Sequence, residues 1–159
     1  MVLVYVDEAG FSAVHPNRSA WTPIGTQHLI GAKRGKRLNV LGALISTGEF
    51  FATTIWQATT SEIFIEFIES LKKFIGKPFT IILDNASIHK NNSMKSAIPY
   101  FKEDGVSFYF LPPYSPELNR IELFWRQMKH SWMGVKNRTS EELENDVNEI
   151  IENFGGKYK

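Results

Sequence analysis

The 159-residue chain contains no cysteine, which excludes disulfide bonds and cysteine-ligated zinc or iron–sulfur centres. Its four histidines show no paired spacing of the kind that metal ligands adopt; they are His15, His28, His89 and His130. No apolar run approaches the roughly 18 residues of a membrane span. The N-terminus reaches acid at Asp7 without the basic leader of a signal peptide. We therefore expect a cytoplasmic protein with no membrane partner.

A strong net charge is also missing, because the formal value is only +1, so bulk charge does not predict binding to nucleic acid. The basic residues are nevertheless clustered, and Lys33, Arg34, Lys36 and Arg37 fall within five positions. A solvated turn and a phosphate-binding patch both fit this cluster. With 43% apolar and 22% charged residues, the chain has the size and composition of one domain, residues 1–159, with a single core.

Apolar runs and turns predict five strands. Val2–Val6 and Phe79–Leu83 are continuous runs of the kind found in central strands covered on both faces. Residues 38–46 and 50–57 flank a tight turn and predict a hairpin, and residues 106–111 predict a fifth strand. Between the first strand and the hairpin, residues 11–37 predict a long excursion that carries the basic cluster.

Helical periodicity follows each later strand. A helix is predicted from the capping-box pair Thr59 and Glu62 to Gly76, and a weaker one over 91–102 around Pro99. Another follows LPPYSP, with one apolar stripe formed by Ile121, Phe124, Trp125, Met128 and Trp132. The last starts at Thr139, which has capping-box spacing with Glu142. This element order predicts an α/β chain with a mixed five-stranded sheet and helices on both faces. It is the order of the ribonuclease H-like fold.

Three carboxylates are placed where this fold would bring them together. Asp7 and Asp84 each follow an apolar run, so parallel pairing of those strands would put both at one edge of the sheet. Glu122 can approach from the helix after the stiff proline loop Leu111–Pro116. Three gathered carboxylates repel one another, and a hard divalent cation, Mg²⁺ or Mn²⁺, relieves that repulsion. Two such ions about 4 Å apart can activate a water and stabilise the leaving oxygen in phosphodiester cleavage.

Each of these residues also has an ordinary structural interpretation. Asp7 and Asp84 could be turn or cap residues, and Glu122 could simply match the dipole of its helix. His89 could contact substrate or donate to a backbone carbonyl. Arg126 and Lys129 could hold phosphates, or they could pair with Glu122 as neighbours on one helix.

The sequence resembles the catalytic domain of DDE transposases, in the bacterial insertion-sequence branch related to mariner elements. The matching pieces run from Tyr5 to Trp125 in order: VYVDEAGF, WTPIGT, KRLNVLGALI, IILDNASIHK and LPPYSPELNRIELFW. The resemblance implies two-metal catalysis, DNA cleavage and strand transfer at transposon ends, with Asp7, Asp84 and Glu122 as the catalytic, metal-binding triad. It also implies a homodimer in the DNA complex, through a clamp at residues 11–37 that includes Trp21. The family usually has proline where this chain has Arg120, which should alter the helix entry slightly.

Such transposases carry helix-turn-helix domains before the catalytic domain, and this chain begins on the first catalytic strand. We expect that DNA-binding domain to be absent here, whether the chain is a fragment, a separate reading frame or a remnant. Two rival functions remain open: a hydrolytic ribonuclease H-like nuclease, and a non-catalytic DNA-binding remnant. Without an element to read bases, basic residues such as Arg126, Lys129, Lys136 and Arg138 predict weak, sequence-indifferent DNA binding.

Overall fold

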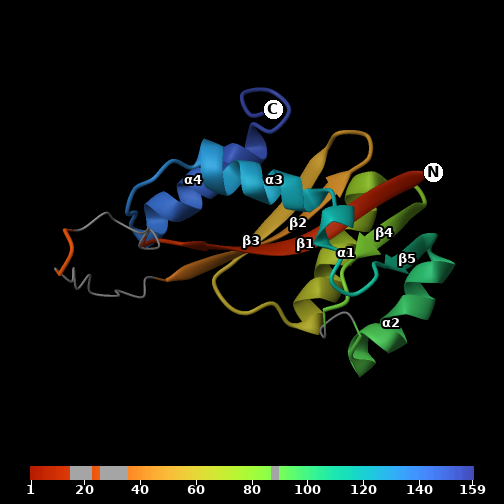
Figure 1. Cartoon of the computed structure of the whole chain (residues 1–159). Helices are drawn as coiled ribbons and strands as arrows, with labels where there is room; N and C mark the ends of the chain where they lie inside the picture. Colours follow the sequence, from red (N-terminus) through yellow and green to blue (C-terminus); the bar gives the residue numbers. More distant parts are fainter. Residues whose placement is uncertain (15–22, 26–35, 87–89) are drawn as a thin grey trace.

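The computed structural model describes residues 1–14, 23–25, 36–86 and 90–159, and five strands in them form one mixed sheet (Figure 1). The strands lie in the order β3-β2-β1-β4-β5. β1 pairs antiparallel with β2, and β2 with β3, whereas β4 and β5 join the other side of β1 in parallel. Their bounds are Val2–Ser12 for β1, Arg37–Ile45 for β2, Phe50–Ile55 for β3, Phe79–Leu83 for β4 and Val106–Phe110 for β5. The predicted five-stranded mixed sheet is confirmed.

Helices cover both faces of this sheet, as predicted. Alternating residues of β1 point to opposite sides: Val4 and Val6 pack against α1 and α2, while Ala9 and Phe11 pack against α3 and α4. In Figure 1 the α3–α4 layer lies on one side of the strands and α1 on the other. The helices are α1 (Ser61–Ile75), α2 (Asn92–Glu103), α3 (Ile121–Gln127) and α4 (Ser140–Glu152), with a 3₁₀ turn at Pro116–Leu118 and a π-helical turn at Met128–Trp132. In the described ranges, none of these helices combines the length and the apolarity needed to cross a membrane.

Helix boundaries agree with the sequence patterns except at the start of α1. The predicted cap was Thr59, but Thr60 is the N-cap, because its Oγ1 accepts from the Ile63 amide three residues on. The capping box predicted at Thr139 and Glu142 is present in full. Pro99 lies inside α2 without ending it.

The first strand is longer than predicted, and this changes the position of Asp7. β1 runs to Ser12, so Asp7 lies in the middle of a strand and pairs with Gly42 of β2, instead of ending the strand. The continuation alternates buried Ala9 and Phe11 with polar or small residues, which is the pattern of a strand covered on one face. That alternation was the signal that could have predicted the extension. It also means that β1 takes up the first residues of the predicted excursion.

Candidate active site

Asp7 and Asp84 lie level with each other across neighbouring parallel strands. The register pairs Val2 with Phe79 and Tyr5 with Ile82, and two further residues along each chain lead to Asp7 and Asp84. β4 ends at Leu83, so Asp84 is the first residue beyond its strand. The two carboxylates predicted to meet at one place in the sheet are therefore brought to the same level, although only one of the two strands ends there.

Glu122 reaches this place because α3 is fixed on the sheet by its apolar stripe. Ile121, Phe124 and Trp125 are buried, and Phe124 stacks on Phe50 of β3 with ring centroids 4.0 Å apart. The predicted stripe is thus the buried face of the helix. Glu122 lies in the first turn at the border of that face and is half-buried. Burial of this aromatic cluster contributes several kcal/mol to holding the helix, and with it the carboxylate.

A glycine opposite Asp7 makes the close approach of α3 possible. A Cβ added at Gly42 would lie 2.7 Å from the Trp125 ring and 2.9 Å from the Phe50 ring. Real Cβ contacts are not that short, so any other residue at this position would push the helix outward. Sequence reasoning treated Gly42 only as part of a strand. Its role depends on a contact between residues far apart in the chain.

We expect Gly42→Ala to lower the free energy of unfolding by about 1–3 kcal/mol, since the added methyl overpacks the contact with Trp125. Urea unfolding monitored by tryptophan fluorescence measures the change. Gly156→Ala is the matched control, because a Cβ there would meet only the Asn153 carbonyl oxygen at 3.7 Å. Equal stability of the two variants would contradict the proposed packing role.

Asn119 connects the start of α3 to the strand that carries Asp7. Its side-chain Nδ2 donates to the carbonyl oxygen of Val6 at 3.4 Å. Its backbone carbonyl oxygen accepts from the Glu122 amide at 3.0 Å. The side chain is only 2% exposed. One residue therefore sets the spacing between the backbones that carry Asp7 and Glu122. Local sequence patterns carry no signal for this contact, because its two residues are 113 positions apart.

Asn119→Ala should lower the free energy of unfolding by about 1–3 kcal/mol, because it leaves the Val6 carbonyl without this buried donor. Asn153→Ala is the control, since Asn153 makes the same kind of bond, to the Glu149 carbonyl, on the exposed surface. Denaturant unfolding of both variants provides the comparison. If Asn119→Ala lowered the free energy of unfolding no more than Asn153→Ala does, the buried hydrogen bond would contribute little to stability.

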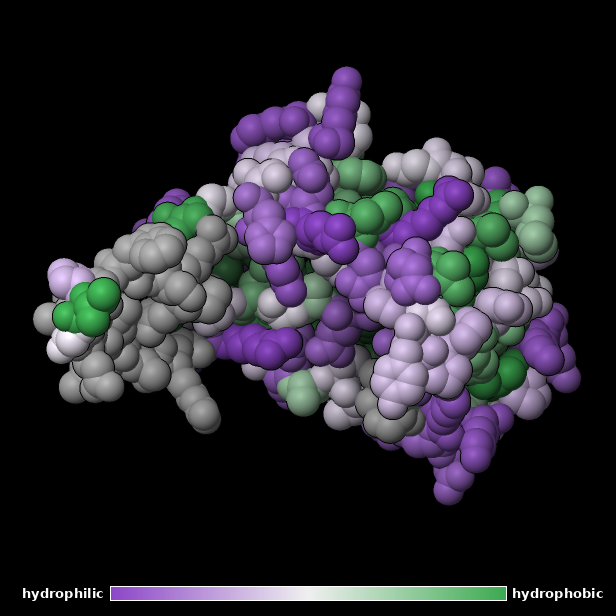
Figure 2. Space-filling model, viewed as in Figure 1, coloured by the Kyte–Doolittle hydropathy of each residue, from purple (hydrophilic) through white to green (hydrophobic). Residues whose placement is uncertain are grey.

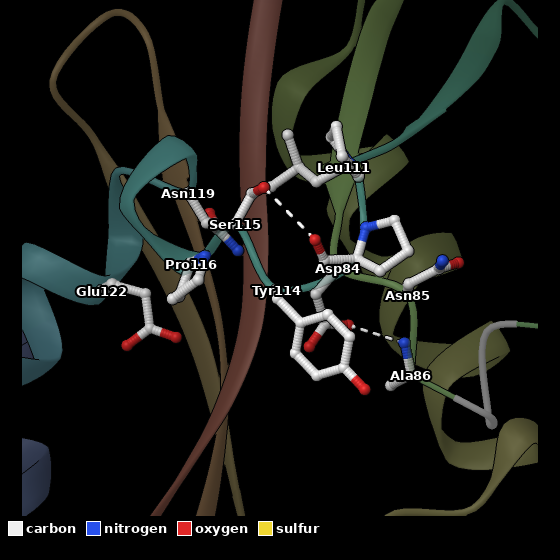
Figure 3. Close-up of a pocket in the computed structure, with 11 residues that line it drawn as sticks. Asp84, Asn85, Ala86, Leu111, Tyr114, Ser115, Pro116, Asn119 and Glu122 are labelled. Carbon is white, nitrogen blue, oxygen red and sulfur yellow. Dashed lines mark hydrogen bonds between the residues drawn. The ribbon is translucent and has the colours of Figure 1, made fainter.

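A pocket of about 420 Å³ lies between these carboxylates and the proline loop (Figure 3). Asp84 and Glu122 lie on its wall, as does Asn119, three residues before Glu122. In Figure 3, Glu122 and Asp84 lie on either side of the β1 ribbon. The Asp84 carboxylate accepts from the Ala86 amide at 3.2 Å, which orients it at the start of the following loop. Glu117, the other glutamate after the loop, is exposed and is not part of this wall.

Asp7 does not line this pocket, but it lies near both of the acids that do. Burial raises the pKa of the Asp7 carboxyl to about 7, helped by the negative charges of Glu122 and Asp84 and by a side-chain hydrogen bond with Glu122. The Glu8 amide, which donates to Asp7, acts in the opposite direction. Both of the other predicted carboxylates therefore lie near enough to disfavour the charged form of Asp7.

The donor set fits a hard divalent cation. It consists of carboxylate oxygens, and the nearby Asn119 Oδ1 is buried and makes no hydrogen bond within the described part of the chain. The raised pKa of Asp7 shows that the uncompensated charge is costly, which is the condition that a cation relieves. Among residues 1–14, 23–25, 36–86 and 90–159, however, no three acidic or histidine side chains lie close enough to enclose one ion. The three carboxylates are therefore near one another, but they are too far apart in this structure to coordinate one ion together.

The predicted DNA-contacting residues lie in different surroundings. Lys36, Arg126 and Lys129 are exposed, and Arg37 lies across Gly10 near the far end of β1, five residues or about 16 Å from Asp7. Figure 2 shows hydrophilic side chains over much of the outer side of α3. The predicted contacts Lys33, Arg34 and His89, and Trp21 of the predicted clamp, fall outside the described residues.

Two further residues near α3 are arginines with defined contacts. Arg138 was predicted to contact phosphate, but its side chain is 4% exposed; its Nε donates to Asp146 at 2.6 Å and its guanidinium also bonds the Met133 carbonyl. It holds the chain before α4. Arg120, where the family usually has proline, has a φ of −58°, a value that proline also adopts. Its guanidinium lies over the Tyr5 ring, 5.8 Å from the centroid.

Comparison with known proteins gives a consistent result. Residues 2–144 match the family described as DDE superfamily endonuclease. A solved catalytic domain of Mos1 mariner transposase superposes with a TM-score of 0.69 at 12% identity, covering 94% of this chain and 69% of that one. A Mos1 mariner paired-end complex with Mn gives 0.72 at 14% identity, covering 94% and 48%. A simian T-cell lymphotropic virus intasome chain gives 0.61 at 12% identity, covering 93% and 47%.

A curated relative is less informative about function. An uncharacterized protein of Sinorhizobium fredii, y4pE/y4sA, is 37% identical over 59 residues, which is 37% of this chain and 39% of that protein. The chain thus spans less than half of this curated relative and about half of several of the solved transposase chains that it matches. The structural likeness confirms the predicted ribonuclease H-like fold.

Proposed function

Because this chain belongs to the DDE superfamily endonucleases, we propose that it is the catalytic domain of a transposase that cleaves DNA at transposon ends and joins the 3′ end to target DNA. The observation that carries the proposal is the convergence of three acids from two parallel strands and the helix after the proline loop: Asp7 is level with Asp84, and Asp84 and Glu122 share one pocket wall. The structural neighbours are transposase complexes with transposon ends, which supports DNA as the substrate.

Asp7, Asp84 and Glu122 would hold the divalent cations, Mg²⁺ or Mn²⁺. The active complex would contain two such ions. Solved Mos1 complexes with Mn and with Mg support this choice of metal. When bound, such a pair supplies an activated water and stabilisation of the leaving oxygen. The protein contributes the placement: the sheet holds Asp7, the buried face of α3 holds Glu122, and Asn119 sets the distance between their backbones.

The basic residues divide into two groups with different expected roles. Arg126 and Lys129 lie on the same helical segment as Glu122 and would hold the phosphates beside the site. Lys33, Arg34, Lys36 and Arg37, with His89 as a further contact, would extend the binding surface along the DNA. In a homodimer on paired transposon ends, residues 11–37 would form the contact between copies. If paired ends carried monomers and no dimers, that result would contradict the arrangement.

Metal-dependent nicking of labelled transposon-end DNA tests the function, with and without an added end-binding domain. A transposase joins the 3′-hydroxyl end to a target strand, whereas a ribonuclease H-like nuclease yields only hydrolysis products. Binding of DNA without any metal-dependent product would instead favour a non-catalytic remnant. Joined product that depends on Mg²⁺ or Mn²⁺ supports the proposal.

DNA binding by this chain alone should be weak, indifferent to sequence and strongly dependent on salt, since phosphate contacts dominate such binding. Replacing Arg126 and Lys129 together by Gln should flatten the plot of log affinity against log salt by about two units of slope. Filter binding at several salt concentrations measures this, with Lys157→Gln as the control, because Lys157 is paired with Glu149 at the C-terminus. Nanomolar selectivity for one end sequence would contradict the prediction.

A further inference from the structure

Tyr114 has a backbone conformation that its side chain does not favour. Its φ is 57°, and within the described residues it is the one non-glycine residue with a positive φ. This left-handed region costs a residue with a Cβ about 1 kcal/mol or more, and a bulky side chain is rarely found there. Glycine or asparagine would satisfy the same turn at lower cost.

Burial of the ring does not compensate for this cost. The Tyr114 side chain is 101% exposed, so it contributes nothing to the core. The turn itself depends on its neighbours: Pro113 and Pro116 restrict the chain, and the Ser115 hydroxyl donates to the Pro113 carbonyl at 3.4 Å. Folding therefore does not explain a tyrosine at this position, and strained residues of this kind concentrate at functional sites.

The location of the ring indicates what it contacts. Tyr114 lines the same pocket as Asp84 and Glu122, and in Figure 3 its ring is drawn over the Asp84 side chain, on the same side of the β1 ribbon. A DNA strand whose phosphate is held by the acids carries its bases within one nucleotide of that phosphate. An exposed aromatic face next to a phosphate site is a surface on which a base can stack, and such stacking tolerates any base.

We propose that Tyr114 is a stacking platform for an unpaired base adjacent to the phosphodiester that the site cleaves. The inference rests on the proposed DNA-cleaving function, and it adds that the preferred substrate is locally unpaired. A base inside a duplex is covered by its neighbours on both sides, so the ring can reach a base face only where the strand is open or frayed. The stiff proline loop holds the backbone of Tyr114 in place beforehand, which lowers the entropic cost of stacking.

Fluorescence of 2-aminopurine tests the contact directly. The base is placed next to the cleavage position in a DNA with an unpaired end, in Ca²⁺ instead of Mg²⁺, and is compared with the fully paired DNA. The native chain should quench the unpaired probe, and Tyr114→Phe should quench it equally. Tyr114→Ala should lose the quenching and bind the unpaired DNA about tenfold more weakly.

Two further variants serve as controls. Tyr109→Ala removes another exposed tyrosine, 58% exposed on β5 and outside the pocket wall, and should leave quenching unchanged. Tyr114→Gly relieves the backbone strain, so it should fold at least as stably as Tyr114→Ala while losing the quenching to the same degree.

Several outcomes would overturn the stacking contact. Quenching by Tyr114→Ala equal to that of the native chain would do so, as would equal quenching of paired and unpaired probes. Normal DNA binding by Tyr114→Ala, together with lost self-association in sedimentation, would assign the ring to a contact between copies instead. Metal-dependent nicking that persists in such cases would leave the proposed function standing, whereas no DNA binding by any variant would overturn both.

Discussion

Glu122→Gln is expected to reduce Mg²⁺-dependent DNA cleavage by about 10²-fold or more, while leaving the melting temperature nearly unchanged or slightly higher. The substitution keeps the size of the side chain and the buried face of α3, so the fold should be preserved. It removes a charge that raises the pKa of Asp7, so repulsion within the site should fall. Loss of a correctly placed ligand costs activity on this scale, because even a displacement of about 1 Å can cost 10²-fold.

Nicking rates and melting temperatures of matched variants check this assignment. Asp7→Asn and Asp84→Asn should lose cleavage as Glu122→Gln does. Glu117→Gln is the control, because Glu117 belongs to the 3₁₀ turn before α3 and is exposed outside the pocket wall. It should retain most of the activity. Normal cleavage by Glu122→Gln together with loss in Glu117→Gln would show that the wrong glutamate has been assigned.

The second large effect concerns stability against pH in the absence of metal. The Asp7 carboxyl has a pKa near 7 in the folded chain and about 4 when unfolded, so between these values the folded state keeps a proton that the unfolded state releases. The free energy of unfolding should therefore fall as the pH rises from about 4 to 7, by an amount on the order of 4 kcal/mol. Above pH 7 this contribution should remain constant.

Asp7→Asn isolates this effect from the other titrating groups. The variant has no proton to release at this position, so it should be more stable than the native chain at pH 8 and similar to it near pH 4. Urea unfolding in EDTA at a series of pH values gives both curves. Adding Mg²⁺ at pH 8 should raise the melting temperature of the native chain more than that of the variant. Parallel curves for the two proteins would show that Asp7 is not held at a raised pKa.

The elements of the fold could be predicted from the sequence because each has a strong local pattern. The alternation of strands and helices defined the mixed sheet, and the stripe beginning at Ile121 identified the buried face of α3. Asp84 was placed correctly at the end of its strand. Asp7 was expected beside Asp84, and the register brings the two level, but it was wrongly expected at a strand end, because the apolar run stops at Val6 while the strand continues with one-sided burial to Ser12.

The parts that could not be predicted depend on contacts between distant residues. Gly42 permits the approach of Trp125, and Asn119 bonds the Val6 carbonyl; both contacts require the finished sheet. Arg138 looked like a surface cation until the structure paired it with Asp146 on α4. Single glycine, asparagine and arginine residues carry no periodicity, so local patterns cannot distinguish these roles.

The position of Asp7 inside a continuous strand makes the three acids mechanically unequal. Asp7 is held by pairing with Gly42 of β2, inside a strand whose pairing with β4 ends two residues earlier, at Tyr5. Asp84 stands outside its ladder, and Glu122 reaches inward on a longer side chain from a helix that cannot shift without displacing Trp125. Asp7 is thus the most restrained of the three acids, and Asp84 and the Glu122 side chain have more freedom to move. Any contraction around an ion must come from the loop at Asp84 and from rotation of Glu122, with the sheet as the fixed reference against which both are aligned.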